Sequence, residues 1–185
     1  MLLRKAHSNA KMVERLLMKD ILSLECVVLG APVTSVEQAF EAIGQVVRLR
    51  GPARRAEIAQ RLGVRESHGT TAIGYGLAIP HAQIKGLKRP VAAFLRPRRP
   101  IPFEAPDGKP VSDLLVLLVP KPAAPQHFAL LADVRHLLSD RDFRDVLTRC
   151  IDPLEVWQLF EQWPFYTGAA RLRPLTDMQQ CNARP

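Results

Sequence analysis

The sequence predicts a single α/β (α+β) domain in which helices flank a central group of strands. Two observations lead to this class. Apolar residues recur at helical spacing before residue 62 and after residue 125, whereas the segment between them holds short apolar runs separated by Pro, Gly and basic residues. The longest of these runs, Leu114–Val119, has no apolar–polar alternation, which is typical of a strand covered on both faces by helices.

The first elements expected along the chain are a strand and a helix. Cys26–Pro32 is a short β segment closed by Gly and Pro. Apolar residues at helical spacing then predict a helix that begins after an N-cap at Thr34 or Ser35 and stops at Gly51.

A second helix is predicted over residues 53–62, with Gly63 as its terminator. The segment Arg54–Ser67 also resembles the first half of a helix-turn-helix, so DNA binding is an alternative to consider. A recognition helix would have to follow Gly63, and the glycines at 69, 74 and 76 come too soon to allow a stable one. The pattern therefore argues against nucleic-acid binding.

Strands are predicted from residue 70 onward, in Thr70–His81, Val91–Pro97 and Asp113–Pro120. The first of them is expected to end at His81, directly after Pro80. A Pro-Asp-Gly sequence at 106–108 predicts a turn between the second and third strands.

Three helices are expected after Pro125. The first, over residues 126–140, carries an apolar face, and two short helices follow at 141–150 and 153–163. The residues assigned to the apolar face are Phe128, Leu131, Val134, Leu137 and Leu138. The predicted domain spans 21–166, with an N-terminal extension at 1–20 and a C-terminal tail at 167–185.

Composition restricts the class of protein further. Of the 185 residues, 47% are hydrophobic and 24% charged, as in globular proteins, and no apolar run reaches 18 residues. The start of the chain has no apolar core like that of a signal peptide, so we expect a cytoplasmic protein without membrane insertion. A net charge of +8 is compatible with a nucleic-acid partner, with an acidic or phosphorylated partner, or with an Arg-rich solvated surface.

Cysteine, carboxylate and glycine patterns exclude several kinds of site. Cys26, Cys150 and Cys181 are far apart and predict buried or incidental thiols, not a disulfide framework or a zinc site. No metal-ligand spacing, nucleophile elbow or phosphate-binding glycine loop is present, so neither a metal nor a cofactor is expected.

Five histidines can be weighed one by one. His7 and His136 are expected to be incidental, and His68 lies in a loop before Gly-Thr-Thr. His81 follows Pro80, whose fixed φ stiffens the chain, in a stretch where glycines allow unusual backbone conformations. An imidazole presented there could act as a base, a metal ligand or a nucleophile. His127 at a helix start is either a polar first-turn residue or a functional group.

Three segments carry a family resemblance: "HGTTAIGYGLAIPHAQI", "PVAAFLRPRRPIPFEAPDGKPVSDLLVLLVP" and "QHFALLADVRHLLSDRDFRDVL". Between about Leu22 and Phe160 the chain resembles the IIA domain of the bacterial phosphotransferase system. The branch is the fructose/mannitol type, and the resemblance is closest to its nitrogen-regulatory members. It implies a mannitol-IIA-like fold, with a central mixed β-sheet between helices.

The resemblance also implies site residues and partners. It makes His81 the phosphoryl acceptor, His127 a second histidine that assists, and Arg65 the arginine before the Gly-Thr-Thr segment. The donor would be a small HPr-like phosphocarrier protein, and the phosphorylation state would decide which cytoplasmic regulatory targets are bound. Family members often have a basic residue where this chain has Gln83.

Two alternatives within the resemblance are a sugar-transport IIA component and a non-catalytic IIA-fold regulator. A transport IIA hands its phosphoryl group to a IIB domain that is often fused or membrane-associated, and the chain shows neither a second domain nor a membrane span. The nitrogen-regulatory type is therefore expected. A dimer is one of the oligomeric states that the sequence allows.

Overall fold

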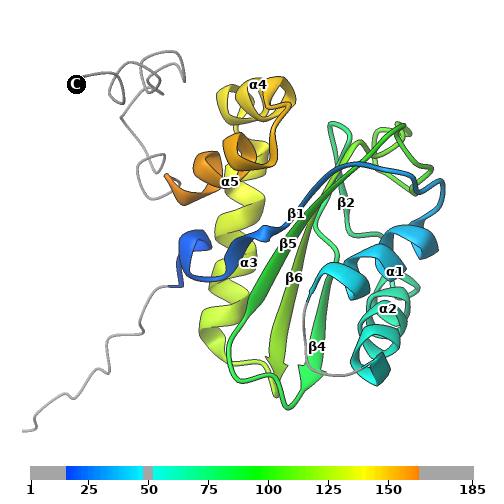
Figure 1. The fold of residues 1–185 in the computed structure, drawn as a ribbon, viewed down its shortest axis with the longest axis vertical. Helices are drawn as coiled ribbons and strands as arrows, with labels where there is room; N and C mark the ends of the chain where they lie inside the picture. Colours follow the sequence, from blue (N-terminus) through cyan, green and yellow to red (C-terminus); the bar gives the residue numbers. More distant parts are fainter. Residues whose placement is uncertain (1–15, 48–51, 163–185) are drawn as a thin grey trace, which may run out of the picture.

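A six-stranded mixed sheet lies between two layers of helices in the computed structural model, which describes residues 16–47 and 52–162 (Figure 1). The elements are η1 (Met18–Asp20), β1 (Leu22–Ala31), α1 (Val36–Val46), α2 (Pro52–Glu66), β2 (Ala72–Gly74), β3 (Leu77–Ala78), β4 (His81–Lys85), β5 (Val91–Pro97), β6 (Asp113–Lys121), α3 (Pro125–Ser139), α4 (Arg141–Arg149) and α5 (Pro153–Glu161). Helices α1 and α2 cover one face of the sheet, and α3, α4 and α5 cover the other. The predicted fold class is confirmed.

The strand order is β1–β5–β6–β3–β2, and β4 pairs with β6 beyond the end of β3. The β5–β6 and β2–β3 pairs are antiparallel, whereas β1–β5, β3–β6 and β4–β6 are parallel. In the β4–β6 ladder His81 lies opposite Leu117, so the register fixes His81 against the middle of a central strand.

The core is centred on β6, whose residues Leu114 to Leu118 are all buried. This burial confirms that the strand is covered on both faces. On the side of α3–α5, the ring of Phe160 packs against those of Phe94 and Phe143, with ring centroids 5.9 and 5.4 Å apart. Such tilted aromatic pairs combine a large buried apolar area with favourable ring geometry.

Both glycine stops predicted for the first two helices are wrong. Helix α1 begins after Ser35, whose side chain accepts the Gln38 N–H as expected of an N-cap, but it ends at Val46; Gly51 lies outside the described residues. Helix α2 continues through Gly63 to Glu66. A glycine inside a helix weakens it by only about 1 kcal/mol, and the hydrogen-bonded turns run on until Gly69, where φ is +134°.

The predicted strand at Thr70–His81 is in fact two short strands and the start of a third. Strands β2 and β3 form a hairpin whose central residues, Tyr75 and Gly76, both have positive φ, as in a type I′ turn. The Tyr75 N–H donates to a carboxylate oxygen of Asp107 at 2.8 Å. His81 therefore opens strand β4 and does not end a strand, because the chain reverses at the hairpin and continues through Pro80.

The predicted apolar face of α3 is partly wrong. Val134, Leu137 and Leu138 are buried, but Phe128 is 61% exposed, and Leu130 is buried in its place beside His127. In the first turns of α3 the buried positions thus lie about one residue away from the predicted ones, and Phe128 lies outside the core. His136 is exposed, as expected.

Cys26 and Cys150 are buried free thiols, in line with the prediction, and Cys181 lies outside the described residues. Burial raises the pKa of Cys150 to about 11, so this thiol stays protonated at neutral pH. The predicted extension at 1–20 is described only from residue 16, where Met18 is buried, and the predicted tail at 167–185 is not among the described residues.

Candidate functional site

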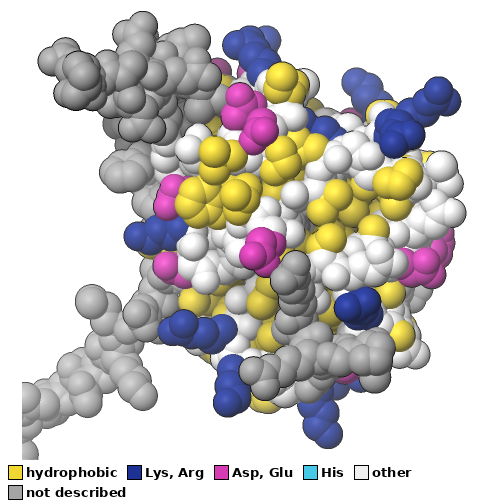
Figure 2. Space-filling model, viewed as in Figure 1, with side chains coloured by type: hydrophobic (Ala, Val, Ile, Leu, Met, Phe, Trp, Pro, Cys, Tyr) yellow, Lys and Arg dark blue, Asp and Glu magenta, His cyan; other side chains and the backbone are white. Residues whose placement is uncertain are grey.

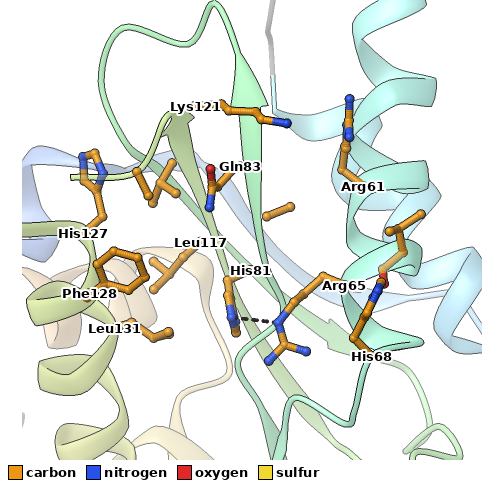
Figure 3. Close-up of a pocket in the computed structure, with 14 residues that line it drawn as sticks. Arg61, Arg65, His68, His81, Gln83, Leu117, Lys121, His127, Phe128 and Leu131 are labelled. Atoms are coloured by element: carbon orange, nitrogen blue, oxygen red, sulfur yellow. Dashed lines mark hydrogen bonds between the residues drawn. The ribbon is translucent and has the colours of Figure 1, made fainter. Parts of the chain in front are cut away.

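A pocket of about 590 Å³ lies where α2, β4, the end of β6 and the start of α3 meet. All three predicted site residues line it (Figure 3). Arg65 comes from the last turn of α2, His81 from the first position of β4 and His127 from the first turn of α3. Three elements far apart in the sequence thus meet around one imidazole.

Both ring nitrogens of His81 have a defined partner. Nδ1 lies 2.9 Å from the carbonyl oxygen of Ile79, and Nε2 accepts the Nε–H of Arg65 at 3.0 Å. A carbonyl can only accept, so the ring proton is on Nδ1 and the lone pair of Nε2 faces Arg65 and the pocket. This arrangement presents Nε2 as a nucleophile.

The environment keeps His81 neutral. Burial lowers its pKa below the usual value of about 6.5; the Arg65 cation lowers it further, while the Ile79 carbonyl and Glu66 oppose the shift. Neutral imidazole is the form with a free lone pair, so the site favours the reactive form at neutral pH.

Arg65 is held in place by a second hydrogen bond. Its Nη1 donates to the carbonyl oxygen of Gly69 at 2.8 Å, at the turn that ends α2. The guanidinium is therefore anchored at one nitrogen while another points at His81. A planar cation fixed in this way can donate hydrogen bonds to the oxygens of a phosphoryl or carboxylate group.

His127 lies on the opposite wall and forms no hydrogen bond with His81; in Figure 3, Leu117 lies between the two rings. Its Nδ1 accepts the Ala124 N–H at 2.9 Å, so in the neutral ring the proton is on Nε2. Burial lowers the pKa of His127, which favours this neutral form. His127 can therefore donate one N–H, from Nε2, to an anion in the pocket.

Glu66 is a positioning residue that the sequence reasoning missed. Its carboxylate accepts the Thr71 N–H at 2.8 Å and also the Thr71 hydroxyl, and the Thr71 carbonyl accepts the Ile79 N–H at 3.0 Å. Ile79 in turn holds Nδ1 of His81. This chain of hydrogen bonds ties the end of α2 to the orientation of the imidazole.

The remaining lining is basic or apolar. Of the fourteen residues that line the pocket, none is Asp or Glu, and the cations are Arg61, Arg65 and Lys121. The others are Val64, His68, His81, Ala82, Gln83, Leu117, Val119, Ala123, His127, Phe128 and Leu131. A pocket with cations and imidazoles but no carboxylate suits an anion, and its apolar walls suit a protein surface or organic group around that anion.

Basic residues do not gather into a stripe on the face drawn in Figure 2. Lys and Arg side chains stand out near the margin of that face, and hydrophobic side chains gather across its middle. Helix α2 is followed by the β2–β3 hairpin, so no recognition helix follows it. The described residues hold no group of three or more side chains suited to a metal ion, and none of their helices is both long and apolar enough to cross a membrane.

The fold and the site together define an α/β protein with a histidine, whose pKa is lowered, in a pocket lined by cations and no carboxylate. Residues 20–163 match the family model described as phosphoenolpyruvate-dependent sugar phosphotransferase system, EIIA 2, and the chain belongs to this family. The nitrogen regulatory protein of Bradyrhizobium diazoefficiens is 35% identical over 141 residues, which cover 76% of this chain and 92% of that protein.

Solved structures agree with this assignment. The crystal structure of nitrogen regulatory protein IIA-Ntr from Neisseria meningitidis is similar with a TM-score of 0.72 and 35% identity, covering 77% of this chain and 97% of that chain. The crystal structure of IIA mannitol from Escherichia coli, with a TM-score of 0.59 and 17% identity, covers 75% of this chain and 97% of that one and shares the fold. The chain is thus a IIA protein of the phosphotransferase system, similar to the nitrogen-regulatory members.

Proposed function

We propose that the chain accepts a phosphoryl group on Nε2 of His81 from an HPr-like phosphocarrier protein and regulates cytoplasmic target proteins by its phosphorylation state. The observation that carries the proposal is the pair of contacts on the His81 ring, with the proton held at Nδ1 by Ile79 and the lone pair at Nε2 facing Arg65. The family and the nitrogen-regulatory relatives support the regulatory role.

The transfer is an in-line exchange between two imidazoles. The lone pair of His81 Nε2 forms the new N–P bond while the N–P bond of the donor phosphohistidine breaks, and its electron pair returns to the donor ring. The proton on Nδ1 stays bonded to Ile79, so no base has to act at His81. The phosphoryl group remains a phosphoramidate, and therefore keeps its transfer potential.

Arg65 and His127 stabilise the phosphoryl group during transfer. The Nε–H of Arg65, which bonds Nε2 in the free protein, exchanges this partner for a phosphoryl oxygen. His127 adds its Nε2–H from the other wall, beside the N–H groups at the start of α3. The transition state of phosphoryl transfer spreads negative charge over its oxygens, and positioned donors lower its energy.

Incubation with a phosphorylated HPr-like donor tests the proposal. We expect one acid-labile, base-stable phosphate per chain, and none in His81→Ala. His136→Ala is the matched control, because His136 is exposed and outside the pocket, and it should be labelled like the wild type. Undiminished labelling of His81→Ala would refute the assignment. Labelling that leaves binding to target proteins unchanged would refute the regulatory part.

A further inference from the structure

The pocket has a second basic end, formed by Arg61 of α2 and Lys121 at the end of β6. In Figure 3 the Lys121 side chain extends toward α2, where Arg61 lies, and Gln83 lies between Lys121 and His81. Both cations are exposed, and neither forms an ion pair or a side-chain hydrogen bond with any other described residue. Their charges are therefore available to a partner.

Arg61 and Lys121 lie further along α2 and β6 than Arg65, which contacts His81, and Leu117, which pairs with it. Lys121 lies four residues beyond Leu117, the partner of His81, which places its backbone about 13 Å further along the strand. Arg61 lies one helical turn before Arg65, about 6 Å along the axis of α2. Arg65, which donates to Nε2 of His81, is therefore the cation next to a phosphoryl group on that nitrogen.

Several features point to a protein-borne carboxylate as the occupant. The lining holds no acidic residue, so any negative charge at this end has to come from outside the pocket. Between the basic end and Phe128 the walls are apolar, with Val119 and Ala123 in the lining and Phe128 61% exposed. Apolar contact beside a charged contact is typical of a protein–protein interface.

We propose that Arg61 and Lys121 form a docking subsite for an acidic side chain that the phosphoryl-donor protein carries near its phosphohistidine. The inference rests on the proposed function, because it names the chemistry of the donor surface. The subsite binds the donor's carboxylate while Arg65 receives the phosphoryl oxygens, and it thereby sets which phosphocarrier proteins align with His81. Such complementary charges raise the association rate and discriminate between partners.

Charge-reversed Arg61→Glu/Lys121→Glu tests the inference against two donors: a phosphorylated HPr-like phosphocarrier protein from the same organism, and phosphoramidate, a small donor without a docking surface. With the protein donor at low salt we expect kcat/KM to fall about 100-fold, and the deficit to shrink as ionic strength rises. The loss should be at least ten times smaller with phosphoramidate. Arg55→Glu, on the same helix but outside this pocket, is the matched charge-reversed control and should behave as the wild type.

The outcomes separate the inference from the function on which it rests. Faster transfer in the charge-reversed variant, or kcat/KM within twofold of the wild type, would show that the donor presents no acid there and would overturn the inference while leaving the function standing. Equal losses with both donors would also overturn it, because the two cations would then act on His81 itself. If neither donor labels the wild type, the proposed function fails, and the inference fails with it.

Discussion

Replacing Arg65 by lysine is the sharpest test of how the pocket acts. Arg65 uses two nitrogens at once: Nε contacts Nε2 of His81 at 3.0 Å, and Nη1 holds the Gly69 carbonyl at 2.8 Å. A lysine keeps the positive charge but has a single nitrogen, so it cannot anchor itself and reach the phosphoryl group together. Arg65→Lys therefore removes one charge-assisted hydrogen bond from the transition state.

The size of the effect follows from that one bond. A hydrogen bond to a charged group contributes about 1.5–3 kcal/mol, and each 1.4 kcal/mol corresponds to a factor of ten in rate. Single-turnover transfer from a saturating phosphorylated HPr-like donor should slow by about 10- to 100-fold. The measurement is the rate of 32P appearance on the chain in rapid-quench experiments. A rate for Arg65→Lys within twofold of the wild type would refute the proposal that Arg65 acts through two nitrogens at once.

The pH profile adds a readout that a merely structural role would not move. Transfer requires neutral His81, so its rate falls as the pH drops through the pKa of His81, which burial and the Arg65 cation hold below about 6.5. In Arg65→Gln the cation is lost, the pKa of His81 rises, and the acid limb should move to higher pH. Arg65→Lys keeps the charge and should leave the limb in place. If the acid limb lies at the same pH in both variants, the Arg65 charge does not lower the pKa of His81.

Two further predictions concern His127 and the glycines. His127→Ala should slow transfer by about tenfold, with a smaller effect on donor binding, because one N–H donor is lost. His127→Gln keeps an N–H and should recover part of the rate. Equal rates for the two variants would contradict the role of His127 as a hydrogen-bond donor. Gly63→Ala should raise the free energy of unfolding in urea by about 0.5–1 kcal/mol, since the added Cβ meets nothing within 4 Å inside α2. Gly76→Ala should lower it by about 2 kcal/mol, because φ is +73° and the Cβ would lie 2.9 Å from Ser112 Oγ. Shifts of the same sign in both glycine variants would rule out this account.

The sequence predicts the fold class because hydrophobic periodicity reports which faces are buried, and β6 and the late helices show it clearly. Prediction from the sequence fails where the same residue type occurs in two different structural roles. Gly63 is indistinguishable in sequence from a helix terminator, yet α2 continues through it to Glu66. Phe128 has helical spacing compatible with the core, yet it is exposed at the pocket.

The candidate site was also predictable from the sequence only in part. His81 and Arg65 could be named from the resemblance, and the structure brings them into contact. The hydrogen bonds from Glu66 through Thr71 to Ile79 could not be predicted, because they join α2 to the β2–β3 hairpin, which the sequence patterns do not indicate. Arg61 and Lys121 are 60 positions apart and look like ordinary surface charges until β4 and β6 pair.

The contact between Ile79 and His81 also decides which chemical isomer the protein would store. With Nδ1 occupied by a proton that the Ile79 carbonyl holds, the phosphoryl group can join the ring only at Nε2, which yields 3-phosphohistidine and not 1-phosphohistidine. The two isomers differ in hydrolytic lability and in the antibodies that recognise them. A backbone carbonyl two residues before the histidine, held through Thr71 by the Glu66 side chain, would thus select the isomer formed on a phosphorylated His81.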